Sequence, residues 1–263
     1  MTARRRPLAL TGALAGALLG AVVALVVFAP AAWLADALAS ATGERVLLAD
    51  ARGSVWSGSA VPVLTGGAGS HDASALPGRL QWTLGLDGLA LGVRARQACC
   101  IEGELRLRVE PGWNGVRITL PASTGAVGHW PAAWLAGLGT PFNTLQLGGT
   151  LSLASGGFVA ESSAGRWRFS GEAALTIAGL SSRVSTLDTL GSYRLRIDGG
   201  EVAHVALETL DGALRLAGSG QWSASGLRFR GEARAAPGFE ASLNNLLNLI
   251  GRRQGTMAVL SIG

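Results

Sequence analysis

From Val46 onward, the chain repeatedly alternates an apolar residue with Arg, Ser or Thr. The stretches with this pattern are residues 79–84 (RLQWTL), 104–109 (ELRLRV), 116–120 (VRITL), 150–153 (TLSL), 165–170 (GRWRFS), 192–197 (SYRLRI), 213–217 (ALRLA) and 226–230 (GLRFR). Because successive side chains of a strand point to opposite faces of a sheet, this alternation predicts strands with one apolar and one solvated face. Glycines supply turn signals at the spacing of hairpin-linked strands. We therefore expect a mainly β fold: a curved antiparallel sheet or a sandwich-like domain with one or two short helices.

An uncharged run precedes this region. Residues 8–29 (LALTGALAGALLGAVVALVVFA) contain no charged side chain, and the run is long enough for a transmembrane α-helix. Arg4, Arg5 and Arg6 lie just before it and should stay in the cytoplasm by the positive-inside rule. The sequence thus predicts a single-pass membrane protein whose C-terminal part lies on the far side of the membrane; in a bacterium, this is an inner-membrane protein with its C-terminal domain in the periplasm.

A cleaved signal peptide is the alternative for this run. The segment Ala29-Pro30-Ala31 has the small residues of a cleavage site. However, the apolar run is longer than the usual hydrophobic region of about 7–15 residues, and a proline lies within the site. The anchor is the favoured interpretation, and the sequence leaves the choice between anchor and cleaved signal open.

These features divide the chain into four parts. We expect a cytoplasmic tail at residues 1–7, a transmembrane anchor at 8–29, a juxtamembrane helix or linker at 30–45, and a periplasmic β-rich domain at 46–263. Within the linker, residues 31–41 (AAWLADALASA) have helical spacing, and Trp33 suits a membrane interface.

Two interruptions of the strand pattern predict short helices. Residues 129–138 (HWPAAWLAGL) and 240–250 (EASLNNLLNLI) have apolar residues at helical spacing, and the second ends at Gly251. Residues 256–262 should then return as a terminal strand. The motif R-F-x-G-E-A occurs at 168–173 and again at 228–233, which suggests a repeated strand-turn-strand unit.

Charge and motifs exclude several functional classes. All 22 basic residues are Arg, and beyond Pro30 there are 19 of them against 17 acids, too balanced for a nucleic-acid binder. No phosphate-binding glycine motif or nucleophile elbow occurs. His71, His129 and His204 are more typical of surface or turn residues than of a catalytic triad. The Glu102/Glu104 pair should simply share one face of a strand. We expect no enzyme, and no catalytic, cofactor-binding or metal-binding residues.

Two further features, the cysteine pair and the tryptophans, can each be interpreted either as part of the packing or as functional. Cys99 and Cys100 are neighbours; in a strand they would point to opposite faces. Packing, with one thiol buried and one semi-exposed, is therefore favoured over a bond within the pair, and an intermolecular bridge is the alternative. The tryptophans suit a sheet core, but in a curved sheet some could line an apolar groove. They are Trp56, Trp82, Trp113, Trp130, Trp134, Trp167 and Trp222.

Several segments together resemble protein N of the bacterial type II secretion system (general secretion pathway). They occur in order at residues 34–38 (LADAL), 48–60 (LADARGSVWSGSA), 76–82 (LPGRLQW), 134–145 (WLAGLGTPFNTL), 181–183 (SSR), 190–195 (LGSYRL) and 245–253 (NLLNLIGRR). The Cys99-Cys100 pair is also similar to a feature of some members. The β-rich region further resembles the sheet domains of AsmA-like envelope proteins, a likeness of fold alone.

The resemblance implies an accessory inner-membrane component of the secretion system without catalytic residues. It would act in the periplasm by protein-protein interaction during export of folded proteins across the outer membrane. Its partners would be other secretion subunits at the inner membrane and the secreted proteins. Exposed strand edges would offer docking by β-augmentation. The alternative is a periplasmic carrier of lipid or another hydrophobic ligand in an open β groove. The sequence does not identify the contacted subunit, its surface, the stoichiometry, the oxidation state of the cysteines or whether the sheet is open.

Overall fold

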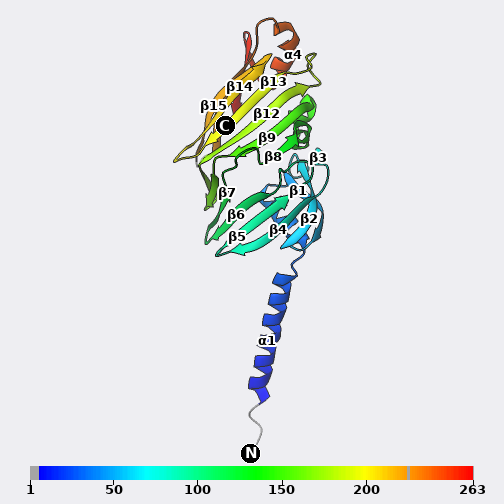
Figure 1. Cartoon of the computed structure of the whole chain (residues 1–263), viewed down its shortest axis with the longest axis vertical. Helices are drawn as coiled ribbons and strands as arrows, with labels where there is room; N and C mark the ends of the chain where they lie inside the picture. The colour runs from blue at the N-terminus through cyan, green and yellow to red at the C-terminus, as the bar shows by residue number, and fades with distance from the viewer. Residues whose placement is uncertain (1–5, 224–225, 263) are drawn as a thin grey trace, which may run out of the picture.

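The computed structural model describes residues 6–223 and 226–262, and the side chains of residues 16–223 and 226–261. The long helix α1 (Arg6–Val27) extends away from the rest of the molecule, and the short helix α2 (Ala31–Ala41) follows it (Figure 1). In the part of the chain that is described, no helix combines the length and the apolar character that crossing a membrane requires. Of the expected cytoplasmic tail, residues 1–5 lie outside the described residues.

Two antiparallel nine-stranded sheets make up the body of the protein and follow one another along its long axis (Figure 1). Sheet 1, nearer α1, has the strand order β1-β2-β4-β5-β6-β7-β10-β11, with β3 paired to β2. Its strands are β1 (Val46–Gly53), β2 (Ser57–Thr65), β3 (Ala73–Ala75), β4 (Leu80–Asp87), β5 (Ala90–Arg96), β6 (Leu105–Gly112), β7 (Gly115–Leu120), β10 (Phe158–Ser163) and β11 (Arg166–Ser170). The expected mainly β, antiparallel fold is confirmed.

Sheet 2 has the order β17-β18-β16-β15-β14-β13-β12-β9-β8. Its strands are β8 (Gly128–Pro131), β9 (Leu147–Ser155), β12 (Glu172–Ser182), β13 (Gly191–Asp198), β14 (Ala203–Gly212), β15 (Leu214–Ser223), β16 (Gly226–Ala235), β17 (Arg252–Gln254) and β18 (Met257–Ile262). Three further short helices follow in the chain: the 3₁₀-helix η1 (Ala132–Leu138), which contacts β2 and β3 of sheet 1 and β9 of sheet 2, α3 (Phe142–Leu145) and α4 (Glu240–Ile250).

Every segment expected to be a strand forms one, and the helices at 31–41 and 240–250 match α2 and α4. The helix expected at 129–138 is partly wrong, because His129, Trp130 and Pro131 belong to strand β8, where they pair with β9. Only Ala132–Leu138 is helical, as a 3₁₀-helix. Pro131 is the N-cap residue, in an extended conformation.

The two sheets are connected by a hairpin that lies within the sequence of sheet 2 but pairs with sheet 1. Strands β9 and β12 are neighbours in sheet 2, yet the hairpin β10–β11 between them pairs with β7 and so extends sheet 1. The buried Ser155 stabilises this departure: its Oγ donates to the Leu120 carbonyl (3.2 Å) and accepts the N–H groups of Gly157 (3.1 Å) and Phe158 (3.2 Å).

The chain returns to sheet 2 at Gly171, which requires a glycine. Its φ is +77°, and a Cβ there would lie 1.8 Å from the Gly157 carbonyl oxygen. The two copies of the R-F-x-G-E-A motif therefore lie in different settings: residues 168–173 span the change from β11 to β12, whereas 228–233 lie within the single strand β16. The repeated unit stays a prediction.

Each sheet has its own core, covered by a helix. In sheet 2 the core consists of Leu145, Leu180, Leu190, Tyr193, Ala213, Leu214, Ala233, Leu243, Leu246, Leu247 and Ala258, and α4 contributes three of the leucines. In sheet 1, Ala31 of α2 packs with Ala60 and Trp82. The Tyr193 hydroxyl donates to the Leu214 carbonyl at 2.8 Å, and burial raises the pKa of this phenol.

Two substitutions on α4 test how much this helix contributes. Leu246 is 2% exposed in the core, so Leu246→Ala should lower the free energy of unfolding by about 2–5 kcal/mol through the cavity it leaves. Leu249 lies on the same helix and is 46% exposed, so Leu249→Ala should cost about 0.5 kcal/mol or less. Urea unfolding followed by circular dichroism measures both, and equal losses would contradict the role of α4.

Candidate functional site

The three histidines lie on separate elements. His71 is exposed in the loop between β2 and β3, His129 is on β8, and His204 is exposed on β14. In the described residues, no group of three or more His, Cys, Asp or Glu side chains could hold a metal ion. His129 has a carboxylate neighbour, since its Nδ1 is 2.8 Å from an Oε1 of Glu102.

The cysteine pair departs from the expectation of packing. Cys99 and Cys100 form a disulfide with each other. The expectation was wrong because the pair does not lie in a strand: residues 98–100 form a turn between β5 and β6, so the two side chains are not directed to opposite faces. Cys99 is exposed, and Cys100 is 4% exposed.

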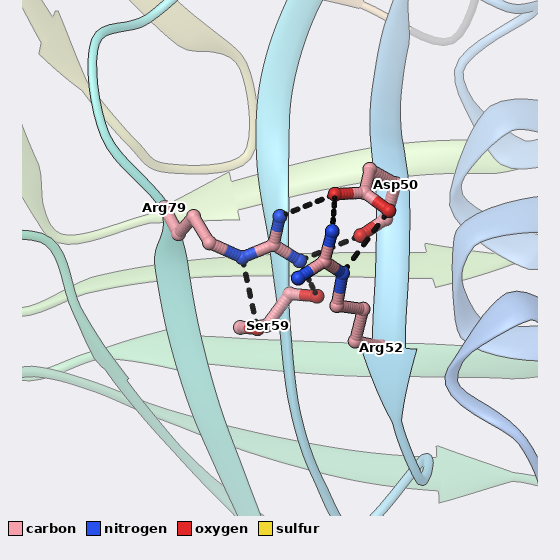
Figure 2. A network of polar contacts seen from close by, with 4 residues as sticks. All are labelled: Asp50, Arg52, Ser59 and Arg79. Carbon is pink, nitrogen blue, oxygen red and sulfur yellow. Dashed lines mark hydrogen bonds and ion pairs between the residues drawn. The ribbon is translucent and has the colours of Figure 1, made fainter.

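A network of polar contacts joins three strands of sheet 1 close to α2 (Figure 2). Arg79, just before β4, reaches across β2 to Asp50 on β1, with 2.7 Å between its Nη1 and Asp50 Oδ2. Its other nitrogens donate to the Asp50 carbonyl (2.6 Å), the Ser59 carbonyl (3.0 Å) and the Ser59 Oγ (3.1 Å). Arg52 adds a second ion pair to Asp50 at 2.8 Å.

The network stabilises an irregular part of β1, the edge strand of sheet 1. The pairing of β1 with β2 shifts between Ala49 and Arg52, and Asp50 has a φ of +50°, which non-glycine residues seldom adopt. Hydrogen bonds from Arg52, and then from Arg79, hold the pKa of the Asp50 carboxyl below its usual range. Both arginines therefore favour the ionised carboxylate.

The turn between β1 and β2 contacts the end of α1. The Trp56 Nε1 donates to the Val26 carbonyl (2.8 Å), and the Val55 N–H donates to the Ala29 carbonyl (2.8 Å). From the other side, the Trp82 Nε1 donates to the Val55 carbonyl (3.0 Å). One indole group and one amide thus connect the turn to the end of α1 and the residue Ala29 after it, and a second indole group ties the turn to β4.

Ion pairs engage most of the arginines on the solvated face of sheet 1. Glu104 lies between Arg96 (2.6 Å) and Arg106 (2.9 Å), and hydrogen bonds from Arg106, and also from Arg96, lower its pKa. Further pairs are Arg108 with Asp87 (2.6 Å) and Glu110 (3.0 Å), and Arg117 with Glu161 (3.0 Å). Glu102 and Glu104 do not share a strand face as expected, because both precede β6 and bind different partners.

The solvated face of sheet 2 differs. Arg228, Arg230 and Arg252 line a shallow cavity of about 620 Å³ together with His204, Ser219, Gln221, Gln254 and Ser261, and no acidic residue lines it. Strand register brings these residues together: Gln221 pairs with His204 and Arg228, and Arg230 pairs with Ser219 and Ser261. Among the described residues, none of these three arginines has an ion pair. We call Arg228, Arg230 and Arg252 the basic patch.

The tryptophans divide between core and surface. Trp82 is 4% exposed, whereas Trp113, in the turn between β6 and β7, is fully exposed. The ring of Trp167 stacks on Phe169 (6.4 Å between centroids), and Phe169 meets Trp222 edge-on (5.3 Å). Since β11 belongs to sheet 1 and β15 to sheet 2, these rings bridge the two sheets.

The whole sequence was compared with known proteins. A model of type II secretion system protein N matches residues 44–259, which cover most of the chain and nearly all of both sheets. The chain belongs to the type II secretion system protein N family. Comparison with curated proteins and with solved structures gave no significant match.

Membership of the protein N family makes the chain a secretion component, and the family is not known as an enzyme. Two segments that resemble the family, 48–60 and 76–82, meet in the structure, since they hold Asp50, Ser59 and Arg79 (Figure 2). Sequence reasoning found both segments but not their contact. It also missed the basic patch, because arginines on neighbouring strands are far apart in sequence and only the register reveals that they face one another.

The Asp50 network should make folding stability depend on acid. A carboxyl whose pKa is lowered on folding stabilises the protein above its unfolded pKa, near about pH 4, and this contribution is lost as the pH falls through the folded pKa. Asp50→Asn should therefore lower the urea midpoint at pH 7, while the difference from the parent protein should shrink at pH 3.

The two arginines provide the matched comparison. The Arg79 side chain is 29% exposed and has four contacts in the network, whereas the Arg52 side chain is 69% exposed. Arg79→Gln should therefore lower the midpoint more than Arg52→Gln. Equal effects of the two arginine substitutions, or a pH-independent effect of Asp50→Asn, would contradict the stabilising role of the Asp50 network.

Proposed function

We propose that this protein N family member is an accessory inner-membrane component of the type II secretion system that acts by protein-protein contact in the periplasm. It would take part in the export of folded proteins across the outer membrane, with other secretion subunits and the secreted proteins as partners. Family membership supports the assignment to the type II secretion system. Two features of the structure, the exposed helix α1 and the basic patch, support the manner of action.

The side chains of α1 support an anchor. The side chains of Leu18, Leu19, Val22, Val23, Leu25, Val26 and Val27, and of Phe28 just after the helix, are between 49% and 78% exposed. The helix stands clear of both sheets (Figure 1), so the described protein leaves these side chains exposed. A bilayer would cover them, and the arginines at positions 4–6 would then stay in the cytoplasm.

Packing at the end of α1 speaks against removal of the segment as a signal peptide. Ala31, the last residue of the small-residue site, is 1% exposed and packs with Ala60 and Trp82. The carbonyls of Val26 and Ala29 accept hydrogen bonds from the turn at Val55 and Trp56. Cleavage there would remove two acceptors from the folded domain, so the anchor fits the packing better.

The basic patch is the observation that carries the proposal. Sheet 1 neutralises most of its strand arginines with its own acids, while three guanidinium groups of sheet 2 face one cavity without a carboxylate. Unpaired guanidinium groups attract carboxylates and bind them bidentately. The patch lies in the sheet farther from α1 (Figure 1), which suits contact with an acidic surface of a partner subunit away from the inner membrane.

The free strand edges offer a second means of contact. The outermost strands are β1 and β11 in sheet 1, and β17 and β8 in sheet 2; of these, β8 is already covered on its outer side by the loop at residues 97–104. Strand β11 has exposed Arg166 and Arg168 and the partly exposed Trp167. Such an edge can accept an extended segment through main-chain hydrogen bonds, with its charges selecting the partner.

Neutralising the basic patch should weaken association with partner subunits. In the triple variant Arg228→Gln, Arg230→Gln, Arg252→Gln we expect binding to fall by about tenfold or more, because charge pairing at the surface is lost. The recovery of secretion subunits with the chain from gently solubilised membranes, at low and at high salt, measures this. Export of a secreted protein should decline in parallel.

The matched control replaces three arginines that already have acid partners, Arg106→Gln, Arg108→Gln and Arg117→Gln. This variant has the same change in formal charge and should retain partner recovery. Both variants must stay in the membrane fraction for the comparison to hold. Equal recovery with both variants would argue against the basic patch, and recovery of no secretion subunit by the parent protein would overturn the proposed function.

One observation favours a second candidate, a carrier of lipid or another hydrophobic ligand. The apolar side chains of Leu153, Leu175 and Leu195 form a cross-strand row that is only half-buried, and the bridging ring Trp167 is 39% exposed. An open apolar surface of this kind suits an acyl chain. Native mass spectrometry of the full chain, released from detergent, should then show a retained lipid that is lost in Trp167→Ser. A chain free of lipid would exclude the carrier.

A further inference from the structure

The Cys99–Cys100 disulfide lies where the two sheets contact each other at an edge. The loop that contains it, residues 97–104, joins β5 to β6 of sheet 1. It lies against β8, the outermost strand of sheet 2, which pairs on its inner side with β9. The loop thus occupies the outer side of an edge strand that belongs to the other sheet.

Main-chain hydrogen bonds make this contact. The His129 N–H donates to the Cys100 carbonyl (2.7 Å), and the Glu102 N–H donates to the Val127 carbonyl (3.2 Å). Ile101 and Gly128 form an antiparallel bridge between these two bonds. The ion pair of His129 with Glu102 adds a side-chain contact. We call this set of contacts the edge clasp.

The loop and β8 lie so close together that their contact depends on the backbone position of Cys100. A Cβ on Gly128 would lie 2.3 Å from the Cys100 carbonyl oxygen. The N–H groups of Cys100 and Ile101 both donate to the Gln97 carbonyl (3.3 and 3.2 Å), and the buried Gln97 side chain donates to the Pro77 carbonyl (3.3 Å). The bond between adjacent cysteines closes a ring that includes the peptide group between Cys99 and Cys100 and the Cα of Cys100, to which the Cys100 carbonyl is attached. Opening the ring restores rotational freedom to the segment on which the edge clasp depends.

We propose that the Cys99–Cys100 disulfide is a redox-exchange site for a dithiol, and that its reduction loosens the edge clasp between the two sheets. The ligand class is a vicinal or C-x-x-C type dithiol, small or protein-borne. This inference goes beyond the proposed function, and it does not depend on the identity of any secretion partner.

The exchange is balanced in two steps. A thiolate of the dithiol attacks Sγ of the exposed Cys99, the Cys99–Cys100 bond breaks, and Cys100 takes up the electron pair and a proton. The second thiolate then attacks the dithiol's own sulfur in the mixed disulfide, which forms the dithiol's internal disulfide and releases Cys99 as a thiolate that takes up a proton. Two electrons pass from the dithiol to the protein. Attack at Cys99 is favoured because Cys100 is 4% exposed.

The contacts of the edge clasp predict what reduction changes. The amides of Glu102 and His129 should exchange with solvent about 3- to 10-fold faster, as expected when a hydrogen bond of ordinary net strength is lost. Amides in the middle of sheet 2, such as that of Leu195, should keep their protection. The overall fold should persist, since neither core cluster contains a cysteine.

Hydrogen-deuterium exchange of the full chain in detergent, with and without dithiothreitol, tests the proposal. Alkylation under native conditions should detect two thiols after reduction and none before. A thioredoxin-type protein dithiol should reduce the pair as well. Thiols that appear only in denaturant, or unchanged exchange at Glu102 and His129 after native reduction, would overturn the proposal.

Two variants separate the disulfide from the clasp. The double variant Cys99→Ser, Cys100→Ser should show the fast exchange of the reduced protein and no response to dithiothreitol. Gly128→Ala should break the edge clasp directly, so that the same amides exchange fast in both redox states. If the double variant fails to fold, native reduction of the parent protein still decides between the outcomes. If Gly128→Ala leaves these amides protected, the edge clasp is not the element that responds.

Discussion

The change of sheet by the hairpin β10–β11 is the constraint on which the rest of the architecture depends. Neither sheet is made from one continuous part of the chain, because the last two strands of sheet 1 lie in sequence between β9 and β12 of sheet 2. The buried hydroxyl of Ser155 and the positive φ of Gly171 permit the two crossings. The bridging aromatic rings and the edge clasp then add contacts between sheets that the chain already ties together.

The two sheets differ in how their arginines are paired with acidic residues. In sheet 1 the acids lie opposite arginines, so that strand neighbours neutralise one another and the network around Asp50 holds the edge strand near α1. In sheet 2 the arginines of the basic patch, Arg228, Arg230 and Arg252, face polar residues and no acidic one. The difference separates a sheet whose charges serve its own stability from one whose charges are available to another molecule.

The sequence predicted much of the fold because its period-2 alternation reflects a local property of the strand. The stretches RLQWTL, SYRLRI and GLRFR each became a strand, and the helix over 240–250 was predicted at its observed bounds. Long-range pairing was not predictable: nothing in residues 158–170 indicates that they join β7 rather than stay between β9 and β12. The helix predicted over 129–138 failed at its start because pairing with β9 outweighed helical spacing, and the cysteine pair was misjudged because its turn was taken for a strand.

The hairpin β10–β11 also determines the order in which the two sheets can be completed during folding. Strand β7 has no outer neighbour until residues 158–163 have been made, and these residues follow two strands of sheet 2. A chain that enters its compartment from the N-terminus must therefore hold sheet 1 unfinished, with an open edge, while sheet 2 begins to form. Completion of the first sheet is thus a step in the folding of the second, so a truncation near residue 147 would leave an exposed edge at β7 instead of a free-standing domain.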